Sequence, residues 1–259
     1  MRPCAIIPAY RATRTVADVV RETRALWPVP DAVFVVDDGS LDETADLARG
    51  AGAIVLSHAR NRGKGAALRT GMAHAAKLGF DVAVTLDADA QHPPAEAARL
   101  AFVEPDPNAL VLGIRDLVRA GAPRPNQVSN RISNFYLSLF TGRILADTQC
   151  GLRRYPIATT LALGGRDDGY AFEAEIIMRA IAAGVRIVEE PIDVIYPPGR
   201  ERVSHFDSVR DPARIIRRVV LTMVDVRLNP VRVPAPTRAH HDGPDRISRD
   251  SSRESIAGL

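Results

Sequence analysis

Short apolar runs alternate along the first half of the chain with segments whose apolar residues recur at helical spacing. The runs lie at 5–10, 31–36, 53–56 and 82–86. One helical repeat is formed by Val16, Val19, Val20 and Leu26. Near-continuous apolar strands that alternate with helices are typical of a parallel sheet covered by helices on both faces. The pattern therefore predicts an α/β fold.

Polar residues follow the second and third predicted strands. The acidic turn 37–40 ends in Ser40, a candidate N-cap, and Glu43 stands at the capping-box position, so we expect a helix to begin there. Lys64 lies between two glycines after the third strand and precedes a helix that ends near Gly79. Each turn thus leads from a strand into a helix.

The six residues from Asp87 to His92 follow the fourth strand and carry the clearest chemical signal. Side chains at i, i+2 and i+4 of an extended chain point to one face, so Asp87, Asp89 and Gln91 can converge at the carboxyl end of a strand. Open α/β sheets bind their ligands at this end. Two close carboxylates repel unless a cation lies between them, and oxygen ligands suit a hard divalent ion that also holds phosphates. A solvated turn is the alternative for such a pair taken alone.

Several motifs together resemble the inverting, metal-dependent family-two glycosyltransferases, in the dolichyl-phosphate mannose synthase-like branch. They lie at 7–10, 36–40, 61–65, 87–93, 113–115, 131–134, 147–153 and 172–175. The resemblance extends over roughly residues 3–215 and implies a GT-A-type, mostly parallel sheet flanked by helices, with a C-terminal helical extension. It implies one glycosyltransferase domain at 1–228. The tail 229–259 has four prolines and no apolar periodicity, so we expect it to be disordered.

The resemblance also implies a binding site for a UDP- or GDP-sugar. Its residues are Pro8, Ala9, Tyr10, Asp37, Asp38, Lys64, Asp87 and Ala88. Arg11 and Ala12 replace the Asn-Glu pair that close relatives carry, which leaves the base open. Lys64 has independent support, because only it and Lys77 are lysines among 34 basic residues. A compact point charge is therefore favoured at this position.

By the same resemblance, Asp89 and Gln91 hold Mg²⁺ or Mn²⁺, and Asp87 holds the ribose or the water shell of the metal. His205 is a further candidate ligand, with an exposed loop histidine as the alternative. The ion would neutralise the charge that develops on the leaving nucleoside diphosphate. Asp87 and Asp89 are accordingly the expected catalytic carboxylates.

The acceptor decides whether the enzyme needs a general base. A lipid phosphate is already ionised and needs only cations, whereas a hydroxyl of a glycan or lipid must lose a proton. Arg115, Arg131 and Arg153 match positions around the reaction centre of the family, and arginine suits phosphate oxygens. The resemblance thus implies a polyprenyl-phosphate acceptor. Glu173 or Glu175 would serve as the base for a hydroxyl.

Composition favours a cytoplasmic protein that is either soluble or peripheral at the inner face of the membrane. A net charge of +3 does not argue for nucleic acid, and two cysteines give no disulfide framework, so a reducing cytosol is expected. We find no signal peptide and no apolar stretch long enough to span a bilayer. Six arginines lie within 199–218, and a helix over 213–228 would place Arg214, Arg217 and Arg218 on one arc. Such a helix could lie on a membrane, or pack its apolar face on its own domain.

Two other classes of protein fit less well. A sugar-1-phosphate nucleotidyltransferase would want a Gly-x-Gly-Thr-Arg loop after the first strand, where Pro8-Ala9-Tyr10 stands instead. Asp87, Asp89 and Lys64 argue against a catalytically dead scaffold.

Overall fold

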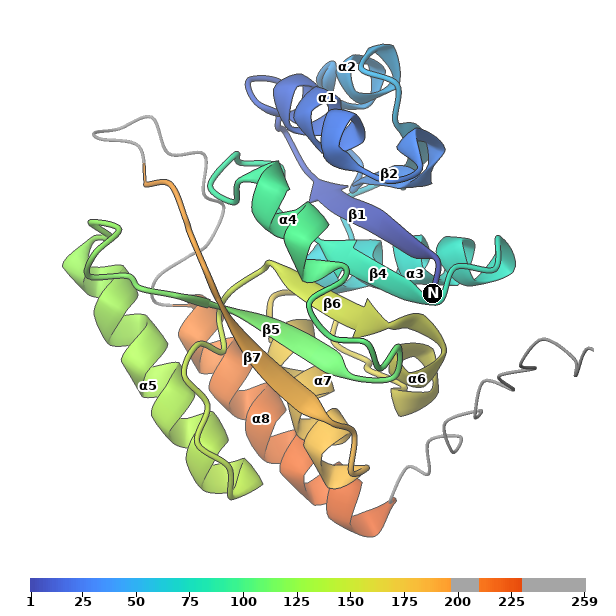
Figure 1. Cartoon of the computed structure of the whole chain (residues 1–259). Helices are drawn as coiled ribbons and strands as arrows, with labels where there is room; N and C mark the ends of the chain where they lie inside the picture. The colour runs from blue at the N-terminus through green and yellow to red at the C-terminus, as the bar shows by residue number, and fades with distance from the viewer. Residues whose placement is uncertain (197–209, 230–259) are drawn as a thin grey trace, which may run out of the picture.

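The computed structural model describes residues 1–196 and 210–229 (Figure 1). The first half contains β1 (Pro3–Ala9), α1 (Val16–Leu26), β2 (Val33–Asp37), α2 (Thr44–Gly50), β3 (Ile54–Ser57), α3 (Lys64–Lys77), β4 (Val82–Thr85) and α4 (Pro94–Leu100). The second half contains β5 (Leu110–Arg115), α5 (Arg124–Thr141), β6 (Arg153–Pro156), α6 (Ile157–Leu163), α7 (Ala171–Ala182), β7 (Ile187–Ile192) and α8 (Arg210–Leu228). A 3-10 turn, η1 (Pro30–Ala32), precedes β2.

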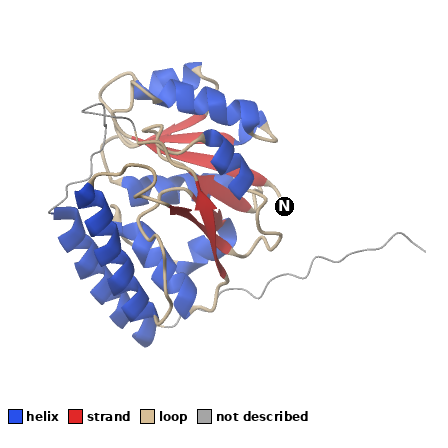
Figure 2. Cartoon of the chain, turned by 60° about the vertical axis from the view of Figure 1, so that its left-hand side comes forward, coloured by secondary structure: helices blue, strands red, loops and turns tan. Residues whose placement is uncertain are grey.

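The strands of the described chain form one sheet in the order β3-β2-β1-β4-β6-β5-β7. Among them, only β6 runs antiparallel to its neighbours, β4 and β5. The predicted α/β fold with a mostly parallel sheet is confirmed, and Figure 2 shows the strands enclosed by helices. Since β1, β2, β4 and β5 share one direction, their carboxyl ends meet at one edge of the sheet.

Close packing of α3 on the sheet fixes the position of its first residue, Lys64. The inward side of α3 consists largely of glycine and alanine, and a Cβ on Gly71 would lie 2.7 Å from the Ile6 side chain on β1. The helix can therefore approach the strands closely. Its first turn then lies beside the carboxyl ends of β1 and β4.

The predicted capping box after β2 is wrong. Helix α2 begins at Thr44, and the side chain of its N-cap residue, Glu43, makes no capping hydrogen bond, although Asp42 accepts the Thr44 N–H at 3.1 Å. The Ser40 hydroxyl instead accepts the N–H of Arg11 at 2.9 Å, and the Thr44 hydroxyl accepts the N–H of Ala12 at 2.9 Å. The turn after β2 is thus held against the loop after β1, and the N-cap lies at Glu43, three residues later than predicted.

The expected C-terminal helix is present as α8 and packs on α7 and α5. Val219 and Thr222 are buried on its inner side, and Asp225 pairs with Arg179 of α7 at 2.6 Å. Packing of this helix on its own domain is therefore observed. None of the described helices combines the length and apolarity needed to cross a bilayer.

Candidate active site

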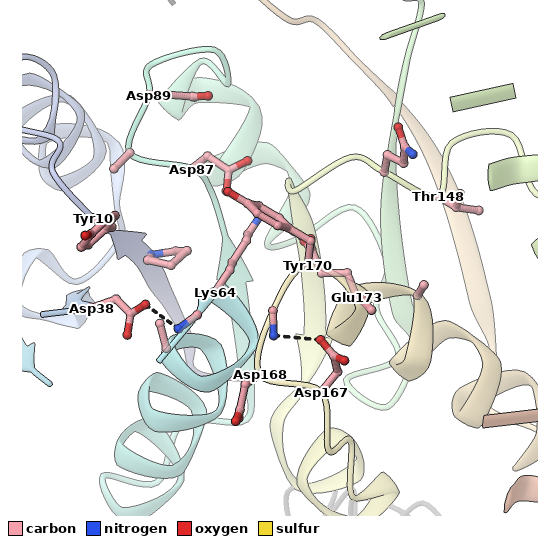
Figure 3. Close-up of a pocket in the computed structure, with 18 of the residues that line it drawn as sticks. Tyr10, Asp38, Lys64, Asp87, Asp89, Thr148, Asp167, Asp168, Tyr170 and Glu173 are labelled. Atoms are coloured by element: carbon pink, nitrogen blue, oxygen red, sulfur yellow. Dashed lines mark hydrogen bonds and ion pairs between the residues drawn. The ribbon is translucent and has the colours of Figure 1, made fainter. Parts of the chain in front are cut away.

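A cavity of about 1350 Å³ opens at the edge where the parallel strands end (Figure 3). One side is lined by the β1 end with Pro8, Ala9 and Tyr10, and by the loop before α3. The floor carries Asp87, Ala88, Asp89 and Gln91 after β4. The other side is built from α5, the loop 166–170 and α8. The structure thus brings together most of the residues predicted to bind nucleotide and metal.

Asp38 fixes the loop that leads to Lys64. Its carboxylate accepts the backbone N–H groups of Arg62 and Gly63 at 2.9 and 2.7 Å and lies 2.6 Å from Nδ1 of His58. The other ring nitrogen of His58 lies 2.9 Å from the Thr70 hydroxyl. Asp38 lines the cavity but is already well supplied with donors. Asp37 is buried below it, where its carboxylate accepts the Ser40 N–H at 3.2 Å.

Lys64 projects between two carboxylates at the centre of the cavity. Its Nζ lies 2.7 Å from Asp87 and 3.3 Å from Glu173. Burial alone would lower the pKa of Lys64, but the charges of Asp87 and Glu173 outweigh it and raise the pKa. Burial would likewise raise the pKa of Asp87, and Lys64 lowers it. The lysine is therefore a fixed positive charge, and Asp87 a fixed negative one.

Glycines make room for this ion pair. A Cβ on Gly151 would overlap the Asp87 carboxylate and lie 2.9 Å from Lys64 Nζ. Gly63 and Gly65 on either side of Lys64 touch the backbone of the loop 166–170, where a Cβ would collide with carbonyl oxygens. The lysine is consequently held between the turn after β4 and the loop before α7.

Asp89 carries the unbalanced charge of the site. Burial and the neighbouring Asp87 carboxylate raise the pKa of Asp89 to about 6. Its Oδ1 accepts the Gln91 N–H at 3.0 Å across a turn in which Ala90 has a φ of 61°. Among residues 1–196 and 217–229, whose side chains the structure describes, no basic side chain forms an ion pair with Asp89. A carboxylate in this state is a strong site for an added cation.

Two predicted metal ligands remain, Gln91 and His205, and His92 follows Gln91 in the same turn. Gln91 lines the cavity beside Asp89. His92 is buried, and burial lowers its pKa to about 4, so the ring is neutral. His205 lies outside the described residues. Within those residues, no group of three or more His, Cys, Asp or Glu side chains is arranged to hold a metal ion.

The three arginines expected at the reaction centre occupy different environments. Arg115 lines the cavity, and two of its nitrogens donate to Asp147 at 2.7 and 3.0 Å. Arg153 is completely buried and donates to three backbone carbonyls at 2.7–2.9 Å, those of Cys150, Thr148 and Glu173. Arg153 therefore holds chain segments together and does not face the cavity. Arg131 is exposed on α5 and is not part of the cavity wall.

Other basic residues line the side of the cavity that the loop 166–170 and α8 form. They are Arg166, Arg217 and Arg218, and Arg218 pairs with Asp167 at 3.0 Å. Sequence reasoning assigned Arg217 and Arg218 only to a helical arc and did not single out Arg166. The signal that could have identified Arg166 was its place in a polar segment directly before the motif at 172–175. Glu175, one of two candidate bases, is buried against Arg179 and accepts the N–H groups of Arg166 and Asp167, so it cannot reach a substrate.

Comparisons with known proteins agree with this geometry. A sequence model of the family described as glycosyl transferase family 2 matches residues 4–158. The undecaprenyl-phosphate mannosyltransferase of Micrococcus luteus is 30% identical over 206 residues, with coverage of 75% of this chain and 84% of that protein. The UDP-N-acetylglucosamine–dolichyl-phosphate N-acetylglucosaminyltransferase of Methanococcus voltae is 29% identical over 216 residues, with coverage of 74% and 84%.

Solved structures share the architecture. Glucosyl-3-phosphoglycerate synthase from Mycobacterium tuberculosis, in complex with Mn²⁺, UDP and phosphoglyceric acid, matches with a TM-score of 0.65 at 19% identity. The match covers 90% of this chain and 80% of that one. At this level of identity the likeness concerns the fold alone, which is the expected GT-A type.

Proposed function

Because the chain belongs to glycosyl transferase family 2 and is a glycosyltransferase, we propose that it moves a sugar from a UDP- or GDP-linked donor to a polyprenyl phosphate. The transfer proceeds with inversion and requires Mg²⁺ or Mn²⁺. The names of the relatives from Micrococcus luteus and Methanococcus voltae, which specify undecaprenyl- and dolichyl-phosphate acceptors, support this acceptor class.

The observation that carries the acceptor assignment is the pairing of the cavity carboxylates. Apart from Asp89, each carboxylate on the described wall has a basic partner. The pairs are Asp38–His58, Asp87–Lys64, Glu173–Lys64, Asp167–Arg218 and Asp168–Arg69. A hydroxyl acceptor needs a carboxylate that is available to take its proton. An ionised phosphate needs only cations, and Arg166 and Arg217 line the same side.

The donor occupies the opposite side of the cavity in this proposal. Pro8, Ala9 and Tyr10 contact the base, and Asp38 fixes the loop that presents Lys64 to the diphosphate. Asp37 lies below this surface and supports the turn. Lys64 can exchange part of its contact with Asp87 for phosphate oxygens without leaving its buried position. The proposal leaves the base of the donor open between uracil and guanine.

The divalent metal fits the donor set of the turn after β4. Asp89 would hold it, because this carboxylate has a raised pKa and no basic partner among the described residues, and Gln91 offers an amide oxygen beside it. His205 stays a predicted ligand. When bound, the ion supplies Lewis-acid stabilisation to the leaving diphosphate. Lys64 adds a second positive charge there, and Arg115, fixed by Asp147, adds a third.

The acceptor side needs orientation more than proton transfer. Arginines around the acceptor phosphate hold one of its oxygens in line with the anomeric carbon of the sugar. The nucleophile is then already positioned for displacement of the nucleoside diphosphate. Arg166 and Arg217 perform this role, and Arg218 is itself fixed by Asp167. Glu173 is held at Lys64 and shapes the field at the reaction centre.

A paired-acceptor assay tests the proposal. The protein is incubated with UDP- and GDP-sugars, Mn²⁺, and either a polyprenyl phosphate or the matching polyprenol, and the lipids are analysed. We expect product from the phosphate only. Arg217→Gln should raise the Michaelis constant for the phosphate by roughly 10- to 150-fold, the value of a charge-assisted contact. Arg21→Gln, exposed on α1 and outside the cavity, is the matched control. Product from the polyprenol would refute the assignment and make Glu173 the base.

A further inference from the structure

Helix α5 turns an apolar stripe toward solvent. Four apolar side chains at spacings of four, three and four residues lie on its outward side, and each is 47–63% exposed. They are Val128, Ile132, Phe135 and Leu139. Asn130 and Leu137 on the inward side are buried. A helix that packs only on its own domain carries polar residues on the side that faces solvent. The outward side of α5 is apolar instead.

Helix α8 repeats the pattern beside α5. Leu221, Val224 and Leu228 are 47–73% exposed on the side opposite the buried Val219 and Thr222. The two helices are in contact, and Figures 1 and 2 show them side by side at one end of the molecule. We call the two stripes together the α5–α8 face. Exposed apolar residues on two neighbouring helices are typical of an interaction site.

The charge around this face has one sign on the α5 side. Residues 117–146, which include all of α5, contain four arginines and no aspartate or glutamate. On α8, Arg217 and Arg227 are exposed beside the stripe, and Asp225 is paired with Arg179 and Asn229. An apolar face with a basic border matches the interface of a bilayer that contains anionic lipids.

The face is continuous with the cavity. Leu221 belongs both to the α8 stripe and to the cavity wall, and Arg217 lies one turn before it. On α5, Ser129 and Ser133 line the cavity on the flank next to the apolar stripe. A ligand could therefore leave the face and enter the cavity along the side that carries Arg166 and Arg217.

We propose that the α5–α8 face lies in the interface of an anionic membrane. This inference rests on the proposed function and names the surface from which the acceptor arrives. The polyprenyl chain stays in the lipid while its phosphate enters the cavity between α5 and α8. Transfer then requires no extraction of a long apolar chain into water, which is unfavourable for every CH₂ group exposed.

Two other occupants fit the face less well. A second copy bound by two-fold symmetry would place the same arginine-bordered surface on both partners, so like charges would meet. The segment 230–259 offers few apolar residues and many charged ones, so it has little to pack on an apolar stripe. A membrane satisfies both the apolar centre and the basic border.

Binding to vesicles tests the surface. The full chain is sedimented with phosphatidylcholine vesicles and with vesicles that contain about one third phosphatidylglycerol. Phe135→Gln/Leu139→Gln should lower partition into the anionic vesicles at least about tenfold, because two exposed apolar anchors are lost. Leu41→Gln/Phe102→Gln, at exposed apolar positions on other elements, should bind like the wild type. Arg131→Glu should weaken binding to the anionic vesicles only, by roughly fivefold or more.

Transfer assays separate this inference from the proposed function. With a long polyprenyl phosphate in vesicles, Phe135→Gln/Leu139→Gln should be slower than the wild type. With a short, water-soluble polyprenyl phosphate and no vesicles, the two should be equal. Wild-type protein that binds vesicles but uses neither acceptor would refute the acceptor and leave the surface intact. Equal vesicle binding by the double variant and the wild type would refute the assignment of the α5–α8 face to the membrane. A wild-type protein that is dimeric in solution, with a monomeric double variant, would also refute it.

Discussion

Replacing Asp89 by asparagine tests the charge imbalance at the centre of the site. The change removes one negative charge and keeps both the size of the side chain and an oxygen for the Gln91 N–H. In the metal-free protein, burial and the charge of Asp87 raise the pKa of Asp89 from 3.8 to about 6. The ionised carboxylate is therefore less favourable in the folded chain than in the unfolded one.

The sign and size of the effect follow from this shift. Between pH 4 and 6 the folded protein holds a proton that the unfolded chain has released, so the free energy of unfolding falls as the pH rises. A shift of about two units corresponds to about 3 kcal/mol. The penalty is absent below pH 4, develops through pH 6 and is complete by pH 8. Lys64 keeps Asp87 ionised across this range, so Asp87 does not cancel the effect.

Urea denaturation in EDTA, from pH 4 to 8, provides the measurement. Relative to Asp89→Asn, the wild type should lose up to about 3 kcal/mol of unfolding free energy over this range. Adding Mn²⁺ with a nucleoside diphosphate at pH 8 should stabilise the wild type much more than the variant, and the variant should lose at least about nine tenths of its transfer activity. Parallel pH profiles of the two proteins would refute the assigned charge state. Equal stabilisation by the metal complex would remove Asp89 from the metal site.

Three further outcomes follow from the packing of the site. Gly151→Ala should lower kcat at least about tenfold, because the added Cβ would separate Lys64 from Asp87. The control Gly50→Ala, with open space at its Cβ, should keep the wild-type kcat. Equal kcat values for the two variants would contradict the close contact at Gly151. Arg153→Met should reduce the free energy of unfolding by about 3–5 kcal/mol, measured by denaturation, since three buried carbonyls lose their donor. Burial raises the pKa of both cysteine thiols to about 12, so a thiol reagent at pH 8 should modify them only after unfolding.

The sheet and its functional edge could be predicted from the sequence because buried parallel strands give a recognisable apolar pattern. β2 and β4 are buried on both faces, so they appear as unbroken apolar runs, and a polar motif follows each. β6 gave no such signal. It begins with Arg153 and Arg154, which sequence reasoning expects at a surface, yet both are completely buried. Their guanidinium groups reach backbone carbonyls, which a linear sequence does not reveal.

In the proposed function, the donor side of the site was more predictable than the acceptor side for a similar reason. Donor-side residues follow strand ends directly, and the strand order alone brings them together. The acceptor-side arginines come from the loop before α7 and from α8, whose approach depends on tertiary contacts such as Arg179–Asp225. The sequence therefore pointed to Arg131 on the basis of motif order. The structure leaves that residue at the border of the α5–α8 face.

The scarcity of lysine in this chain acquires a physical reason at Lys64. Arginine fills nearly every basic position, so its absence from this one calls for an explanation. Nζ lies 2.7 Å from Asp87 and 3.3 Å from Glu173, so one atom contacts both carboxylates. A guanidinium would favour bidentate binding to one carboxylate, whereas a compact ammonium can contact Asp87 and Glu173 together and still turn toward a phosphate. The same geometry thus lets Lys64 share its positive charge with the donor diphosphate of the proposed function.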